Sequence, residues 1–317
     1  MHALLRIIED GEFHSGQALG AALGITRSAV WKRLQHMESE LNIEIHKVRG
    51  RGYRLVSPVS LLRAQYLEAA VLPYGWAVRV YDAIGSTNAE AMRLIAAGQT
   101  LPVLVLSEQQ TAGRGRRGRR WVSPFAENLY YSLALRVNGG MRQVEGLSLS
   151  VGLAVIKTLT EAGIEGAGLK WPNDILVGSS KLAGILLELT GDPADVCHVV
   201  IGVGINVNMR ATDEVDQAWT SMYLEAGRKI DRNGLVSLLS QNLAEYVEAH
   251  RAHGFVAFKE EWERRHLWQG AEVSLLAGSQ EIQGKVLGVD AAGGLRLDVG
   301  GMEQVFHGGE LSLRLRD

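Results

Sequence analysis

Short apolar runs alternate with helical segments through the middle of this 317-residue chain, and this alternation constrains the fold more than any other feature. Strand-like runs occupy Val103–Glu108 and Asn128–Val137, and two more follow at 182–189 and 198–208. A helical pattern covers Leu147–Leu159 and ends near Gly163. This order predicts a mixed β-sheet with helices packed against it. With 46% hydrophobic residues, the chain can bury such a core and form roughly two or three domains.

The region before residue 60 predicts a winged helix. Ser15 is placed to cap a first helix, and Gly24 supplies the turn before a second helix. The stretch Ile43–Val56 then alternates like two strands around the tip at 49–52, which indicates a hairpin. A helix-turn-helix followed by such a hairpin is the pattern of a winged-helix DNA-binding domain.

Positive charge is concentrated in this first region, although the whole chain has a formal net charge of −2. From Arg27 to Arg54, seven Lys/Arg stand against three acids. The candidate DNA-binding residues lie on the polar helix face and at the hairpin tip: Arg27, Ser28, Lys32, Arg33, Arg49 and Arg51. The helix face could enter a major groove. The alternative is a solvated face on a small packing domain.

The stretch "GRGRRGRRW", Gly113–Trp121, interleaves arginine with glycine directly after a buried-looking strand. Alternating glycines let backbone amides approach an anion, and in an extended segment Arg114 and Arg116 would point the same way. Guanidinium groups bind phosphate and carboxylate bidentately. The pattern favours a small bound anion over a nucleic-acid backbone, with a solvated surface loop as the remaining alternative.

Two further stretches contain candidate site residues. In "STNAEAM" (Ser86–Met92), Thr87 and Glu90 have the spacing of a helix capping box, and the same helix start suits a polar ligand head group. The stretch "KWPNDILVGSSKLAGILLE" (170–188) predicts a turn, a short strand, a hairpin and a strand that starts at Lys181. Lys181 could simply extend from a strand end into solvent. Lys170 and Asp174 could form a structural ion pair.

The motifs "STN", "GRGRRGR", "KWPND" and "KLAGIL", in that order behind a winged helix, resemble the bifunctional biotin protein ligases that also repress a biotin operon. The resemblance extends nearly end to end. It implies an α+β multidomain chain: a winged helix-turn-helix at 1–59, a class II synthetase-like ligase domain with a mixed sheet at 60–267, and an SH3-like β-barrel at 268–317.

The resemblance also implies the chemistry. Biotin and ATP would give biotinyl-5′-adenylate, and a lysine of a biotin carboxyl carrier protein would then take the biotinyl group. Arg116 and Lys181 would be catalytic. Biotin or adenylate would contact Ser86, Thr87, Asn88, Gln110, Arg114, Gly115, Arg116, Lys170, Asn173, Asp174, Lys181 and, from the segment Asp213–Gly227 that would cover the adenine, Trp219. The adenylate-bound protein would form a homodimer and hold operator DNA.

Several sequence features bear on metal binding, cellular location and rival functions. No His/Cys cluster has metal-ligand spacing, so no protein metal site is expected and Mg²⁺ would arrive with ATP. The single Cys197, the lack of an apolar signal segment and the lack of a membrane-spanning run predict a cytoplasmic protein that contacts no membrane. Two rivals remain: a lipoate-type ligase, and a biotin-sensing transcription factor without ligase activity, against which the presence of Arg116 and Lys181 argues.

Overall fold

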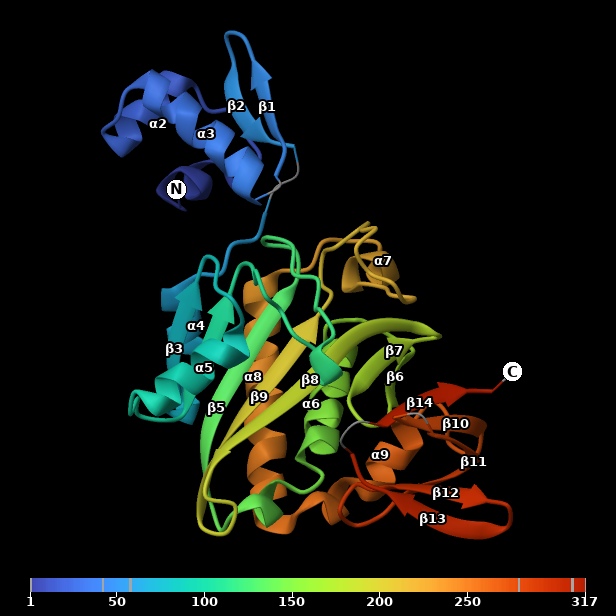
Figure 1. Cartoon of the computed structure of the whole chain (residues 1–317). Coiled ribbons are helices and arrows are strands. Elements are labelled where there is room, and N and C mark those ends of the chain that lie inside the picture. Colours follow the sequence, from blue (N-terminus) through green and yellow to red (C-terminus); the bar gives the residue numbers. More distant parts are fainter. Residues whose placement is uncertain (1, 42, 57–58, 279, 309–310, 317) are drawn as a thin grey trace.

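The computed structural model describes residues 2–41, 43–56, 59–278, 280–308 and 311–316. Its first part is the predicted winged helix, seen at the top of Figure 1. The elements are α1 (His2–Ile8), α2 (Gly16–Leu23), α3 (Arg27–Leu41), β1 (Ile45–Val48) and β2 (Gly52–Leu55). The Ser15 side chain accepts a hydrogen bond from the amide of Ala18, and Gly24 ends α2 at φ +63°. Both predicted helix boundaries are therefore confirmed.

The winged helix has its own core, which also takes in residues from the next domain. Leu4, Val30 and Leu34 are fully buried in this cluster. Phe125 and Ala126, which follow the arginine-rich loop, belong to the same cluster. The winged helix is thus packed against the part of the central domain that adjoins that loop.

In the described part of the chain, seven strands form the predicted central mixed sheet, in the order β3-β4-β5-β9-β8-β7-β6. The strands are β3 (Ala77–Tyr81), β4 (Val103–Ser107), β5 (Leu129–Asn138), β6 (Ala167–Lys170), β7 (Asp174–Val177), β8 (Ser180–Gly191) and β9 (Val196–Ile205). Only the β3–β4 pairing is parallel among them, which makes the sheet mixed. The turn, strand, hairpin and strand predicted for 170–188 are confirmed.

Helices cover both faces of this sheet. The helices are α4 (Ala64–Val71), α5 (Thr87–Ala96), α6 (Leu147–Glu161), α7 (Met222–Ala226), α8 (Arg232–His253) and α9 (Lys259–Arg265), with 3-10 turns at Leu72–Tyr74, Arg116–Gly118, Met141–Val144 and Phe255–Phe258. Alternate residues of β4 point to opposite faces: Leu104 and Leu106 join the large core, whereas Val103 and Val105 pack under α5.

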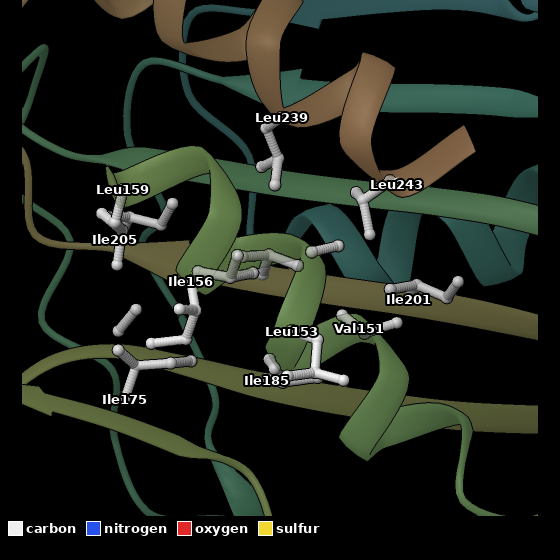
Figure 2. Packing of buried hydrophobic residues seen from close by; sticks show 14 of the residues in the cluster. Val151, Leu153, Ile156, Leu159, Ile175, Ile185, Ile201, Ile205, Leu239 and Leu243 are labelled. Atoms are coloured by element: carbon white, nitrogen blue, oxygen red, sulfur yellow. The ribbon is translucent and has the colours of Figure 1, made fainter. Parts of the chain in front are cut away.

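The large core lies between the sheet and helices α6 and α8. Figure 2 shows Leu153 and Ile156 of α6 close to Ile175 and Ile185 of the sheet, with Leu239 of α8 on the helix side. All five side chains are at most 3% exposed. Burial of this apolar surface fixes the sheet, from whose strands and connecting loops the candidate site is built.

The C-terminal strands form a small antiparallel sheet, in the order β13-β12-β11-β10-β14. The strands are β10 (Glu272–Ala277), β11 (Gln280–Val289), β12 (Leu295–Val299), β13 (Met302–Phe306) and β14 (Leu311–Leu315). This sheet is consistent with the expected SH3-like domain, although no pairing between β13 and β14 closes a barrel within the described residues. The indole of Trp171 donates to the carbonyl of Gly293 over 3.1 Å, which ties this domain to the central one.

Across the described ranges, no helix combines the length and the apolar character needed to cross a membrane.

Candidate ligand site and nucleic-acid interface

A cavity of about 680 Å³ lies where the start of α5, the arginine-rich loop, the β7–β8 hairpin and β14 meet. This volume is in the range of small-molecule sites. The structure brings eleven predicted residues to its wall: Ser86, Thr87, Asn88, Gln110, Arg114, Gly115, Arg116, Lys170, Asn173, Asp174 and Lys181. Trp219 lines a smaller hollow of about 50 Å³ that shares Lys181 with the main cavity.

One end of the cavity is built from uncharged polar groups at the start of α5. The expected capping box at Thr87 and Glu90 is wrong, because Ser86 is the N-cap and Thr87 is already the first helical residue. The Glu90 carboxylate instead accepts hydrogen bonds from the Tyr81 hydroxyl and the Arg93 guanidinium. The Thr87 hydroxyl is therefore free of a capping role and lies 3.1 Å from Gln110 Oε1, to which the Thr87 amide donates over 2.8 Å.

Asn88 is held over the central sheet at the same end. Its amide nitrogen donates to Glu188 Oε2 over 2.7 Å and to the carbonyl of Leu186 over 3.2 Å. A Cβ at Gly202 would lie 2.3 Å from Asn88 Oδ1, which is closer than such atoms can approach. Gly202 is thus required for Asn88 to occupy this position.

The arginine-rich loop is folded rather than extended. The amide of Gly115 donates to the carbonyl of Arg119 over 2.7 Å, and the amide of Trp121 donates to the carbonyl of Gly113 over 2.9 Å. The two arginines were expected to point the same way only in an extended segment, and that condition is not met. Arg114 lies 3.6 Å from Glu188, whereas Arg116 donates to Asn173 Oδ1 over 2.9 Å. The reason is a tight turn at Arg116–Gly118 that reverses the chain.

The other end of the cavity is cationic. Asp174 pairs with Lys181 at 2.6 Å, so the structure replaces the suggested Lys170–Asp174 ion pair with a different partner. The Lys170 ammonium lies over the Trp268 ring, 4.9 Å from its centre. Burial lowers the pKa of Lys170 and of Arg116, while Asp174 opposes this effect at both. Arg116, Lys170 and Lys181 all lie near the Asp174 carboxylate at this end, and such a concentration of cations favours binding of an anion.

Two parts of the wall were missed by the sequence analysis. Trp121 lies against the backbones of Gly184 and Gly204, where a Cβ would come within 3.2 Å and 2.7 Å of its ring. The ring stands 5.5 Å from Lys181 Nζ. The sequence feature that could have identified Trp121 as a wall residue is its position at the end of the stretch Gly113–Trp121. The second part is β14, whose Leu311 carbonyl accepts from Arg116 over 3.2 Å. No local pattern signals that pairing.

The predicted DNA-binding residues are exposed on α3 and at the hairpin tip. Arg27, Ser28, Lys32 and Arg33 lie on the solvent side of α3, and Arg49 and Arg51 lie between β1 and β2. The Arg51 guanidinium stands over the ring of Phe13, 4.2 Å from its centre. Trp31 is 44% exposed on α3 and was not predicted. These positions match a winged helix that presents one helix and one hairpin to a duplex.

Among the described residues, no group of three or more His, Cys, Asp or Glu is arranged to hold a metal ion.

Comparison with known families gives two matches. Residues 84–206 match the biotin/lipoate A/B protein ligase family, and residues 1–54 match an HTH domain. The first match contains the start of α5, the arginine-rich loop and the β7–β8 hairpin. The cavity wall described above is therefore drawn largely from the region that the family shares.

Individual relatives extend this similarity to nearly the whole chain. The "Bifunctional ligase/repressor BirA" of Escherichia coli (strain K12) is 38% identical over 313 residues, which are 98% of this chain and 96% of the relative. The protein of the same name from Bacillus subtilis (strain 168) is 34% identical over 93% of this chain and 92% of its own length. A solved biotin protein ligase from Aquifex aeolicus, in complex with biotin and ATP, is similar with a TM-score of 0.67 at 30% identity, over 76% of this chain and 99% of that one.

Proposed function

Because this chain belongs to the biotin/lipoate A/B protein ligase family, we propose that it is an ATP-dependent biotin protein ligase that also represses transcription. In the first step a biotin carboxylate oxygen attacks the α-phosphorus of ATP, which releases pyrophosphate and leaves biotinyl-5′-adenylate. In the second step a lysine amine of a biotin carboxyl carrier protein attacks the acyl carbon, and AMP leaves. The observation that carries the proposal is one cavity with an uncharged polar end and a cationic end.

The uncharged end fits the head group of biotin. A cyclic urea offers both N–H donors and a carbonyl acceptor. Ser86, Thr87, Asn88 and Gln110 present hydroxyl and carboxamide groups of both kinds there. We assign these four residues to the head group, so that the biotin carboxylate is directed toward the arginine-rich loop.

The cationic end fits the reacting groups. A carboxylate and a phosphate repel each other, and negative charge grows on the phosphate oxygens as they react, so fixed cations lower the barrier. Arg116 is held by Asn173 and Leu311, and Lys181 by Asp174, so both cations are oriented before substrate binds. We assign Arg114, Gly115, Arg116 and Lys170 to the carboxyl and phosphate groups, Lys181 to the reacting oxygens, and Trp219 to the adenine.

Magnesium would enter with ATP and would neutralise charge on the phosphates. Magnesium is commonly bound through one or two carboxylates together with substrate phosphates. Asp174 and Asp216 are acidic side chains of the cavity wall that fit this role. The contacts of Arg116 and Lys181 described above do not depend on magnesium, because their partners are other residues of the chain.

The repressor function rests on the exposed α3 and hairpin tip. We propose that the adenylate-bound protein dimerises in the cytoplasm, and that two winged helices then bind two half-sites of a palindromic operator. The adenylate must bind the dimer-competent state more tightly, since a ligand that binds both states equally shifts neither. We also propose that the domains divide at 59/60 and 267/268.

The test combines the purified chain, ATP, a carrier domain and labelled biotin, with lipoate as the competing acid. We expect labelled biotin on one lysine of the carrier domain. Excess lipoate should not reduce the amount of label attached. Two lysine variants are matched, because Lys181 and Lys157 each pair with a carboxylate at 2.6 Å. Lys181→Met should slow adenylation by about 100-fold or more, and Lys157→Met should leave it unchanged.

Three outcomes would contradict the proposal. Equal transfer of lipoate would indicate a lipoate ligase. Adenylate that forms but never reaches the carrier would indicate a biotin sensor without ligase activity. Equal activity of Lys181→Met and Lys157→Met would remove Lys181 from the reaction.

A further inference from the structure

Glu188 joins two parts of the cavity wall that come from distant segments of the chain. It lies on β8 with its side chain 29% exposed. One carboxylate oxygen, Oε2, accepts from the Asn88 amide over 2.7 Å. The other, Oε1, stands 3.6 Å from the Arg114 guanidinium. Glu188 is not among the residues assigned above to biotin, the adenylate or DNA.

We propose that Glu188 is a positioning residue, which acts through Asn88 to orient the hydrogen-bonding groups of the uncharged end. The inference rests on the proposed function, because it concerns how that end recognises a cyclic urea. Glu188 touches no reacting atom in this scheme. Its effect is on ligand affinity rather than on the chemical step.

The physical basis is a chain of hydrogen bonds that begins at Glu188. Ser132 Oγ lies 2.6 Å from Asn88 Oδ1 and 2.8 Å from Thr87 Oγ1. The Thr87 hydroxyl and amide both reach Gln110 Oε1, and Gln110 Nε2 donates to Ser123 Oγ over 3.2 Å. Three members, Ser132, Asn88 and Thr87, are at most 4% exposed, so water does not satisfy them instead.

The carboxylate fixes the direction of this chain. An ionised carboxylate only accepts, so Asn88 must turn its NH₂ group to Glu188 and its Oδ1 to Ser132. Both amide protons are then used, one by Glu188 and one by the Leu186 carbonyl. Oδ1 can only accept, which leaves the Ser132 hydroxyl as its donor. Because a hydroxyl has one proton, Ser132 Oγ then accepts from the Thr87 hydroxyl, and Gln110 Oε1 accepts from the Thr87 amide. The amide orientation of Asn88 therefore follows from one charge, although Asn88 itself is uncharged.

Removing the carboxylate removes this constraint. Without Glu188, Asn88 can present either its oxygen or its NH₂ to Ser132, and the buried hydroxyl groups can reverse their donor directions. A buried hydrogen bond to a charged group is lost as well. A ligand that needs one fixed arrangement of donors and acceptors then binds to only a fraction of the molecules, which lowers its apparent affinity.

The experiment measures biotin binding to the intact chain by calorimetry without ATP, so that no reaction occurs. Glu188→Ala should weaken biotin binding about 10- to 100-fold. Glu188→Gln retains an acceptor oxygen and should recover part of that loss. The control is Glu248→Ala, which removes a surface glutamate paired with Arg251 on α8 and should leave the affinity unchanged. Thermal unfolding identifies any variant that does not fold.

A double-mutant cycle tests whether Glu188 acts through Asn88. In an Asn88→Ala background, Glu188→Ala should have no further effect on biotin binding, because the group through which it acts is gone. A separate readout is the KM for ATP, which Glu188→Ala should leave within about twofold of the wild type, because its one contact at the cationic end is a 3.6 Å pair with an Arg114 side chain that is 51% exposed, and such exposed pairs contribute little. A merely structural role would change the affinities for biotin and for ATP together.

Two results would overturn the proposal. One is a Glu188→Ala protein that binds biotin as the wild type does. The other is full additivity of the Asn88 and Glu188 substitutions. Failure of the wild-type chain to bind biotin at all is a different result, which would contradict the proposed function itself.

Discussion

Arg232, at the start of α8, is fully buried and forms an ion pair with Glu108, which is also buried. Arg232 donates to the carbonyl of Ser60 over 3.0 Å and 2.6 Å, and to the carbonyl of Asn128 over 3.0 Å. Glu108 accepts from the amide of Leu62 over 2.6 Å. The pair therefore holds the backbone at Ser60 and Leu62, which leads from the winged helix into the central domain. Glu108 itself stands two residues before the site residue Gln110.

We expect Arg232→Met to be among the most destabilising substitutions in the central domain. Methionine fills a similar volume but leaves the Glu108 carboxylate buried without its cation, and removing one partner of such a pair costs about 3–5 kcal/mol. For a chain of this size, each kcal/mol lowers Tm by roughly 2–4 °C, so Tm should fall by roughly 6–20 °C.

A second variant separates loss of charge balance from loss of packing. Adding Glu108→Gln to Arg232→Met removes the uncompensated charge while an amide oxygen can still accept from Leu62. The double variant should recover part of the lost stability in urea and thermal unfolding. The reasoning is refuted if Arg232→Met stays within about 1 kcal/mol of the wild type, or if the double variant is less stable than the single one.

Four further outcomes are expected. Arg116→Ala removes a charge-assisted contact, so adenylate should dissociate about 10- to 100-fold faster and biotin should appear on bystander proteins; unchanged dissociation with weaker operator binding would support the nucleic-acid interpretation of this loop. Burial lowers the pKa of His266 to about 4, whereas an unfolded chain takes up that proton below about pH 6.5. Stability should thus fall by up to about 3 kcal/mol as pH drops from 6.5 to 4, and His266→Gln should remove this part of the loss in acid unfolding curves. Operator binding should weaken steeply with salt, because cations on α3 and the hairpin tip displace counterions from DNA; a flat response in anisotropy titrations would contradict this. Deletion of residues 1–57 should abolish operator binding while adenylate synthesis survives, and a folded truncation without synthesis would show that the two regions are not separable.

The parts of this structure that the sequence predicts are those determined by neighbouring residues. Ser15 and Gly24 mark helix ends because capping and a left-handed turn depend on one or two adjacent peptides. The apolar runs predict strands and their order in the chain, because alternation and burial leave a periodic signal. Motif residues from α5, the arginine-rich loop and the β7–β8 hairpin reach one cavity, as expected from the family resemblance.

The missed features depend on contacts between distant segments or on local reversals. Arg117 adopts φ +58°, an unusual conformation for a residue with a side chain, and the turn around it sends Arg114 and Arg116 to different partners. The ion pair of Asp174 with Lys181 follows from the register of a hairpin. Glu188 and Asn88 are 100 positions apart, so no local pattern connects them.

The central claim is that one bound intermediate serves both ligation and operator binding. The most direct test loads the intact protein with biotin and ATP, removes free nucleotide, binds the complex to labelled operator and then adds carrier domain, while anisotropy and biotin transfer are followed together. We expect that biotin reaches the carrier lysine as the protein leaves the operator, with no transfer to a carrier whose lysine is replaced by arginine. Complete transfer with unchanged operator occupancy, or operator release with no transfer to the unmodified carrier, would contradict it.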